Sequence, residues 1–354
     1  MLNKIKKITI RDILGCLIFL VALVPALIYR VYLRLSKKEL WLVSETANRA
    51  RDNGYVFFCY LKREHPEIAS FYAIDKSCPD YKKVSALGNT VDWASFKHYF
   101  YYMSATKNIS SHKEGNPNHS LFTVLHLYLN LFNNRVFLQH GVIKDDLPMF
   151  YYKNTKFQKF ICGAKPEFDY IEQVYGYPKG HVIYTGLARF DNLHNVKPNK
   201  DIILFIPTWR RWIENKEQLI ESNYYKKMVK FLESKELEEL LTKTGKTLYF
   251  YPHESTQKFI DEFDIKNERV KTLSIKNSDI QKILIEGSLL ITDHSSLFFD
   301  FAYMKKPIIY YHYDIEEYRQ KHTREGYFNF NNYGFGKVCF EKNEVIHELE
   351  SIIK

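Results

Sequence analysis

The sequence lacks the cysteine pattern of a disulfide-stabilised or zinc-binding protein. Its five cysteines are an odd number, are widely spaced and form no C-x-x-C pair. We interpret them as reduced, buried thiols of a protein in a cytosolic compartment. Zinc-type Cys/His spacing, a basic heptad segment and an RNP-like aromatic motif are also missing. We therefore expect no nucleic-acid partner, although the formal charge of +10 would permit one.

Three common nucleotide and hydrolase signatures are absent as well. The chain has no Walker loop, no G-x-G-x-x-G and no G-x-S-x-G, which argues against a P-loop kinase, a dinucleotide oxidoreductase and a standard α/β-hydrolase. What is present is an ordered composition, 45% apolar and 26% charged, over 354 residues. That length fits two domains of roughly 150 residues each. The excess of 51 Lys and Arg over 41 Asp and Glu favours phosphate-rich partners or an anionic membrane surface.

One long hydrophobic run lies near the N-terminus. Residues 13–29 (ILGCLIFLVALVPALIY) carry no charge, and a run of about 17 residues is at the short limit for crossing a membrane. Basic residues flank the run on both sides, so the positive-inside rule gives little preference for an orientation. These flanks and Pro25 leave a broken, re-entrant or interfacial helix as a second option. We predict that residues 1–38 attach to a membrane, with a cleaved signal peptide or a buried globular helix as alternatives.

Short apolar segments alternate with helical or mixed segments along the rest of the chain. The predicted strands are residues 40–44, 70–74, 108–111, 135–139, 160–163, 181–185, 202–206, 247–251, 288–292 and 307–311, with a long charged helical region at 214–243. This alternation is typical of βαβ units and predicts an α/β fold. The polar segment 192–200 is the expected linker between a lobe at 39–191 and a lobe at 201–354.

The sharpest motif is ITDHSS at residues 291–296, which follows an apolar strand and precedes an apolar helix. Open parallel sheets bind ligands at such turns. The small polar residues could cap the helix, and its free N–H groups could hold a diphosphate together with the hydroxyls of Ser295 and Ser296. The alternative is an ordinary capped helix in which Asp293 or Ser295 satisfies its own backbone.

Two histidines and an arginine pair occupy comparable turns. His140 ends a strand of the first lobe, where it could act as a base toward a hydroxyl, while Gly141 could let the backbone approach a ligand. His253 follows a strand of the second lobe and could neutralise phosphate charge. Arg210 and Arg211 follow another strand, and guanidinium groups are natural phosphate ligands. Structural histidines at turns and a surface arginine pair are the alternatives.

Taken in chain order, these segments resemble the CDP-glycerol glycerophosphotransferase family, which makes teichoic-acid-like and capsular glycerol-phosphate polymers in Gram-positive bacteria. The segments are QHG (139–141), YTGLARFD (184–191), PTWR (207–210), PHE (252–254), ITDHSSLFFDFAYMKKPIIYY (291–311) and YDIEEYRQKHTREGYF (313–328). The resemblance implies a GT-B-like pair of Rossmann-type lobes facing a cleft. It also implies that the second lobe binds CDP, that the acceptor approaches from the first, and that the protein works at the cytoplasmic face of the cell membrane.

The resemblance also implies roles for single residues. His140 would be the base for the acceptor hydroxyl, and His253 would act with the donor pyrophosphate. The other implied donor-binding residues are Thr292, Asp293, Ser295, Ser296 and Arg210, and the acceptor-side or supporting residues are Gly141, Arg189 and Asp191. No metal ligands and no cofactor are identified. The family commonly has HGT, TDYSS and PTWRD where this chain has HGV, TDHSS and PTWRR, and Pro252-His253-Glu254 replaces a His-Pro pair.

The predicted reaction is attack of an acceptor hydroxyl on the β-phosphate of CDP-glycerol, or of a related CDP-alditol such as the ribitol compound, with release of CMP. The acceptor would be a cell-envelope polymer or a lipid-linked primer. Two other functions stay open: a GT-B glycosyltransferase that uses a nucleotide sugar, and a non-catalytic, membrane-bound module that binds polyanions. Loss of turnover on replacing His140 or His253 would separate an enzyme from the binding module.

Overall fold

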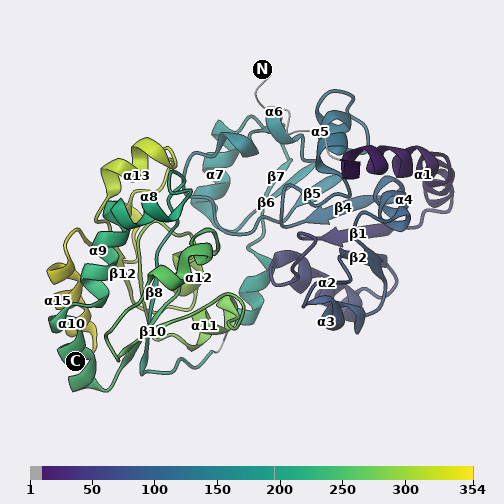
Figure 1. Cartoon of the computed structure of the whole chain (residues 1–354). Helices are drawn as coiled ribbons and strands as arrows, with labels where there is room; N and C mark the ends of the chain where they lie inside the picture. Colours follow the sequence, from purple (N-terminus) through teal and green to yellow (C-terminus); the bar gives the residue numbers. More distant parts are fainter. Residues whose placement is uncertain (1–9, 195, 354) are drawn as a thin grey trace. The chain divides into compact units, whose positions relative to one another are not determined.

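The computed structural model describes residues 10–194 and 196–353, which form two α/β units (Figure 1). Unit 1 consists of the described residues up to Val142 together with Pro148–Asp191. Unit 2 consists of Ile143–Leu147 and the described residues from Asn192 onward. The short segment Ile143–Leu147, which the predicted limits assign to the first lobe, therefore groups with the second unit.

Unit 1 is built on a parallel sheet of seven strands in the order β3-β2-β1-β4-β5-β6-β7. The strands are β1 Leu40–Ser44, β2 Ala69–Ile74, β3 Thr90–Asp92, β4 Lys107–Ser110, β5 Arg135–Phe137, β6 Lys159–Cys162 and β7 Val182–Tyr184. The helices are α1 Ile10–Leu35, α2 Asn53–Glu64, α3 Tyr81–Ser85, α4 Phe96–Ser104, α5 His119–Leu127, α6 Tyr152–Thr155 and α7 Lys165–Val174, with short 3-10 turns η2 Pro148–Phe150 and η3 Ala188–Leu193.

Unit 2 is built on a parallel sheet of six strands in the order β10-β9-β8-β11-β12-β13. The strands are β8 Ile202–Ile206, β9 Thr247–Phe250, β10 Val270–Thr272, β11 Leu289–Thr292, β12 Ile308–Tyr311 and β13 Gly336–Cys339. The helices are α8 Lys216–Glu221, α9 Asn223–Leu232, α10 Lys235–Thr244, α11 Ile280–Glu286, α12 Phe298–Tyr303, α13 Ile315–Lys321, α14 Phe330–Tyr333 and α15 Lys342–Ile353, with the 3-10 turn η4 Glu254–Glu262. The α/β class is confirmed.

The charged region predicted to be helical at 214–243 consists of three helices, α8, α9 and α10. Ser222 ends α8 and begins α9 with an extended backbone, and its hydroxyl accepts a hydrogen bond from the N–H of Tyr225. A serine at this position competes with the helix for backbone groups and favours a new start. Gly245 ends α10 with φ of +69°, a left-handed conformation that glycine adopts without steric cost.

Buried apolar strands hold each sheet in place, and the centre of unit 2 shows this most clearly. Every residue of β8, β11 and β12 is buried, as expected for strands covered on both faces by helices. Fully burying a Leu, Ile or Phe side chain stabilises the fold by about 1.5–3 kcal/mol. Lys306 supports this layer from the KKPI segment, because its ammonium group donates to the carbonyl oxygens of Leu284, Ile285 and Gly287 at the end of α11.

One side of helix α1 packs against the rest of unit 1, and its other side is exposed. Ala22 and Ala26 are fully buried against a cluster that includes residues of α4 and α5, and Ser104 of α4 donates its hydroxyl to the carbonyl of Ala26. Figure 1 shows α1 beside α4. The helix runs through Pro25 without a break. Among the described residues, Asp12–Leu35 is long and apolar enough to cross a membrane by length and composition, and it contains an 18-residue stretch with a mean hydropathy of 2.4.

Candidate active site

His140 lies in a turn that follows β5 at the carboxyl end of the unit 1 sheet. The preceding residue, Gln139, has φ of +60°, which is uncommon for a residue with a side chain. Asn53 donates its side-chain N–H to the Gln139 carbonyl at 2.8 Å, and Gln139 Nε2 donates to Glu167 Oε1 at 3.0 Å. The His140 side chain itself is 67% exposed. The buried neighbours thus fix a strained turn that presents an imidazole to solvent.

A buried carboxylate lies directly behind the His140 ring. Asp52 Oδ2 is 3.6 Å from His140 Nδ1, and Arg189 Nη1 donates to Asp52 Oδ1 at 2.8 Å. The same Arg189 nitrogen donates to the His140 carbonyl oxygen. Burial acts to raise the pKa of Asp52, but the Arg189 guanidinium and His140 hold that pKa well below its usual range. Asp52 is therefore an ionised carboxylate that faces the imidazole.

His112, in the loop after β4, packs against the His140 ring. The ring centroids are 5.4 Å apart and the planes differ by 29°. Burial and the charge of His140 lower the pKa of His112 to about 4, so this imidazole is neutral at pH 7. Ligand atoms of Asp52, His112 and His140 all lie within 4.8 Å of one another, so this trio could hold a metal ion. The guanidinium of Arg189 on the same carboxylate opposes a further cation there.

The other predicted residues of unit 1 are Gly141, next to His140, and Asp191, close to Arg189. Gly141 is buried directly after His140, and Asp191 is exposed in η3, the turn that also carries Arg189. The structure thus brings Arg189 and His140 together as hydrogen-bond partners. Asp52 and His112 were missed by the sequence reasoning. His112 comes just after β4, so applying to every strand end the rule that singled out His140 would have found it, whereas Asp52 stands at the start of α2 and not at the end of β1.

Unit 2 builds its turns around a buried ion-pair network. Arg210 Nη2 donates to Asp293 Oδ2 at 2.8 Å, and Arg210 Nε donates to Asp314 Oδ2 at 2.6 Å. Arg210 Nη1 donates to the Thr208 carbonyl at 2.7 Å. All of these side chains are buried, and although burial acts to raise the pKa of Asp293, Arg210 holds it below its usual range.

Arg210, Asp293 and Thr292, which were predicted to bind the donor, form hydrogen bonds to other groups of the protein. The guanidinium and the carboxylate are committed to each other, and the Thr292 hydroxyl donates to the Ile206 carbonyl at 2.6 Å, which ties β11 to β8. The physical reason is burial, because a buried charged or polar group must be satisfied from within the protein. The hydrogen bonds of these three residues stabilise the turn from its buried side.

Ser295 and Ser296 are the half-buried part of the ITDHSS turn. Ser295 Oγ accepts a 3.4 Å hydrogen bond from the N–H of Leu297. The capping expected from this segment is different in the structure, because α12 begins after Leu297, which has no side-chain cap, and α12 has only six residues. A helix this short contributes little dipole, so any anion binding here depends on the serine hydroxyls and on the N–H groups of the turn.

His253 follows β9 and lies beside an aromatic platform. Its Nδ1 accepts a 3.1 Å hydrogen bond from the N–H of Ser255, so the proton of the neutral ring belongs on Nε2. The ring stacks on Trp209 with centroids 6.0 Å apart and planes at 19°. His322 meets Trp209 edge-on at 5.0 Å. An Nε2–H donor suits a phosphate oxygen. The interpretation of the PTWR segment considered only its arginines and did not single out Trp209.

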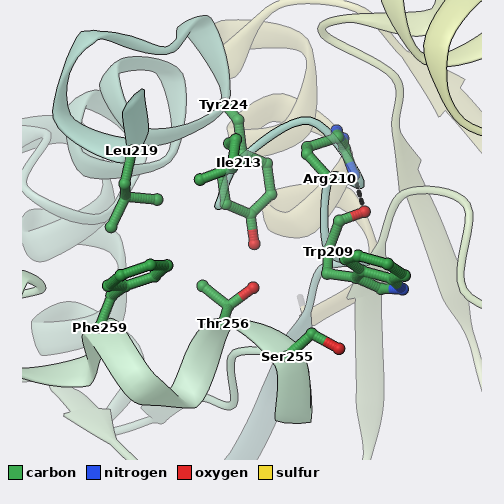
Figure 2. A pocket seen from close by; sticks show the side chains of 8 residues that line it. All are labelled: Trp209, Arg210, Ile213, Leu219, Tyr224, Ser255, Thr256 and Phe259. Atoms are coloured by element: carbon green, nitrogen blue, oxygen red, sulfur yellow. Dashed lines mark hydrogen bonds between the residues drawn. The ribbon is translucent and has the colours of Figure 1, made fainter. Parts of the chain in front are cut away.

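Figure 2 shows a small pocket next to these residues, between Trp209 and Arg210 on one side and Ser255 and Thr256 on the other. Its volume is about 10 Å³, which holds roughly one water molecule. The pocket is thus part of the packing beneath the turn and is too small for a nucleotide.

The chain matches the model of the family described as CDP-Glycerol:Poly(glycerophosphate) glycerophosphotransferase over residues 27–354. It belongs to that family. The resemblance found in the sequence is thereby confirmed.

Single relatives agree with this assignment. The chain is 28% identical over 342 residues to the minor teichoic acid biosynthesis protein GgaB of Bacillus subtilis (strain 168), covering 93% of this chain and 37% of that protein. It is 23% identical over 332 residues to the teichoic acid poly(glycerol phosphate) polymerase of the same strain, covering 85% of this chain and 42% of that one. The chain therefore spans about two fifths of the length of these relatives.

A solved structure, the wall teichoic acid polymerase TagF in its H548A variant, superposes with a TM-score of 0.64 at 18% identity, covering 97% of this chain and 89% of that chain. This likeness confirms the predicted GT-B-like fold.

Proposed function

We propose that the chain transfers glycerol phosphate from CDP-glycerol to a hydroxyl of a cell-envelope polymer or lipid-linked primer and releases CMP. The observation that carries the proposal is the exposed His140 backed by the ionised Asp52, in a chain that matches the family model over residues 27–354. A polymerase of the same fold was solved after a soak with CDPG, which supports the donor. Nucleic acid is not among the proposed partners.

The proposed chemistry needs no covalent intermediate on the protein. The acceptor hydroxyl attacks the β-phosphorus while His140 takes its proton, and the bond from the β-phosphorus to the bridging oxygen breaks as CMP leaves. His253, through its Nε2–H, and the hydroxyls of Ser295 and Ser296 bind the pyrophosphate and stabilise the charge that develops on it. Arg210, Asp293 and Thr292 act behind this turn by holding its shape.

The remaining predicted residues have supporting roles in unit 1. Arg189 fixes both Asp52 and the His140 carbonyl, Gly141 follows the base in the turn, and Asp191 offers an exposed carboxylate on the acceptor side. No metal is assigned a step in this mechanism.

Helix α1 is the proposed membrane attachment, and the envelope is the proposed place of work. Its apolar side chains on the open face are large and well exposed: Ile13, Leu14, Leu17, Leu20, Val21, Val24, Leu27, Ile28, Val31, Tyr32 and Leu35. The opposite face is fixed to the protein through Ala22 and Ala26. A helix packed on a globular unit along one side meets lipid only with its other side. We therefore favour an in-plane helix at the cytoplasmic, anionic membrane face over a spanning one.

The experiment that tests the reaction supplies detergent-solubilised protein with either CDP-glycerol or a nucleotide sugar, with and without an isolated membrane fraction as acceptor. Acceptor-dependent CMP from CDP-glycerol supports the proposal. Release of a nucleoside diphosphate from the sugar donor instead would replace it by glycosyl transfer. Binding of the polymer without either product would leave a non-catalytic module.

A further inference from the structure

Asp52 has the geometry of a residue that orients the catalytic histidine, and neither the sequence motifs nor the family resemblance singled it out. It is the N-cap of α2, and its Oδ1 accepts hydrogen bonds from the N–H of Asn53 at 2.7 Å and from Arg189 Nη1 at 2.8 Å. The other oxygen, Oδ2, lies 3.6 Å from His140 Nδ1. Two donors thus fix one side of the carboxylate while its other side faces the imidazole.

The same residues also fix the backbone that carries His140. The N–H of Arg189 donates to Asn53 Oδ1 at 2.9 Å, and Asn53 Nδ2 donates to the Gln139 carbonyl at 2.8 Å. Arg189 Nη1 completes the circuit through the His140 carbonyl oxygen. Hydrogen bonds of Asp52, Asn53 and Arg189 therefore connect the start of α2, the turn η3 and the strained turn after β5. Such over-determination is what allows a left-handed Gln139 to persist.

Glu45 is a second buried carboxyl beside Asp52. Glu45, directly after β1, accepts hydrogen bonds from the backbone N–H groups of Arg51, Asp52 and Tyr55. Burial and the charge of Asp52 raise the pKa of Glu45 to about 7. Neighbouring carboxyls whose pKa values are pushed apart take different roles. Asp52 is the more acidic of the two carboxyls, and Glu45 holds the loop that carries Asp52 through its three backbone hydrogen bonds.

We propose that Asp52 is a positioning residue for the transfer reaction: its carboxylate, 3.6 Å from His140 Nδ1, favours a proton on Nδ1 and so leaves the lone pair of the neutral ring on Nε2, which then takes the proton of the acceptor hydroxyl. A neutral imidazole carries one N–H, so fixing it at Nδ1 decides which nitrogen is the base. The inference rests on the proposed function for the identity of the reaction. The predicted tautomer of His140 does not depend on the proposed function, because it is a property of the protein without substrate.

The isosteric variant Asp52→Asn separates this role from a structural one. Asparagine is as good an N-cap as aspartate, so the start of α2 is preserved, while the charge is lost and one acceptor oxygen becomes an NH2 donor. A matched control is Asp80→Asn, since Asp80 also precedes a helix of unit 1 and pairs with an arginine, Arg51 Nε, at 2.8 Å.

The test is ¹⁵N NMR of the full-length protein with labelled histidine, at about pH 8.5 where imidazoles are neutral. The His140 signals are identified by their loss in His140→Gln. The wild type and Asp80→Asn should show His140 protonated at Nδ1, and Asp52→Asn should shift it toward Nε2–H, the form that histidine prefers in water. A wild-type ring protonated at Nε2, or a tautomer unchanged in Asp52→Asn, would overturn the proposal.

Kinetics provide the second readout. Asp52→Asn should lower kcat for CMP release about 100-fold, as loss of a correctly oriented base does, with KM for CDP-glycerol within about twofold of wild type. Asp80→Asn should keep the wild-type kcat. A wild-type protein that turns over no CDP-glycerol would defeat the proposed function and leave the tautomer result standing, so the two failures can be told apart.

Discussion

The two units use their polar residues in opposite ways. In unit 1 the imidazole of His140 is 67% exposed, and the charged groups that support it are buried behind it. In unit 2 the charged residues that the sequence marked, Arg210 and Asp293, are themselves buried, and the half-buried Ser295 and Ser296 lie in the turn that they shape. A residue of a sequence motif can therefore contact the ligand or support the turn that contacts it. An exposed side chain suits the first role, and a buried side chain suits the second.

Loss of the exposed His140 should have the largest effect on activity. Replacing His140 by Ala should reduce kcat for CMP release by about 10²–10⁴-fold, because the proton acceptor is lost while the fold is not disturbed. Steady-state kinetics with CDP-glycerol and the membrane fraction measure this. His347→Ala, an exposed histidine on α15, is the matched control and should behave as wild type. Equal activity of the two variants would remove His140 from the mechanism.

Replacing the buried Arg210 of unit 2 should mainly lower the stability of the fold. Arg210→Met leaves Asp293 and Asp314 as unpaired buried charges, which we expect to lower the free energy of unfolding by about 3–5 kcal/mol. Urea denaturation followed by tryptophan fluorescence measures this change. The neighbouring Arg211 is exposed, so Arg211→Met should stay within about 0.5 kcal/mol of wild type. Similar values for both would mean that the network contributes nothing to the fold.

The open face of α1 offers a comparison between apolar residues of the two units. Val24 is 63% exposed on α1, and Ile220 is 40% exposed on α8 of unit 2. Val24→Asp should weaken binding to vesicles of anionic lipid by about tenfold or more, because a charge replaces a side chain that is worth about 1.5 kcal/mol when buried. Ile220→Asp should leave it unchanged in the same sedimentation assay. Full binding by Val24→Asp would locate the attachment elsewhere.

Acid should weaken both units by a smaller, graded amount. Burial lowers the pKa of His98 in unit 1 to about 3 and that of His312 in unit 2 to about 4. The unfolded chain takes up these protons near the ordinary pKa of about 6.5, whereas the folded chain does not, so the free energy of unfolding falls as the pH drops from about 6.5 toward 4. We expect on the order of 1 kcal/mol per histidine at pH 5.5. Denaturation midpoints at a series of pH values test this, and His98→Gln should flatten the slope.

Much of the fold could be predicted because central strands carry the signal. The strands β8, β11 and β12 are fully buried and read as apolar runs. The missed strands, β3, β10 and β13, are sheet edges in which only one residue each is buried, so they show no such run. Edge strands depend on tertiary pairing, which a local pattern does not contain.

The site was only half predictable for a related reason. The turns after β5 and β11 stand out in the sequence because each combines a strand end with reactive residue types. Asp52 was missed because its partner His140 is far away in the sequence, and only the fold brings them together. The burial of Arg210 was equally hidden, since a guanidinium beside a second arginine looks like a surface pair until Asp293 and Asp314 are placed around it.

The most direct test of the whole account follows the fate of the glycerol. Protein and membrane fraction are incubated with CDP-glycerol labelled in the glycerol, and CMP release and label in the acceptor are measured together for the wild type and for His140→Ala. The account predicts equal amounts of CMP and incorporated glycerol for the wild type and loss of both in the variant. CMP release without incorporation, or incorporation that survives in His140→Ala, would contradict it.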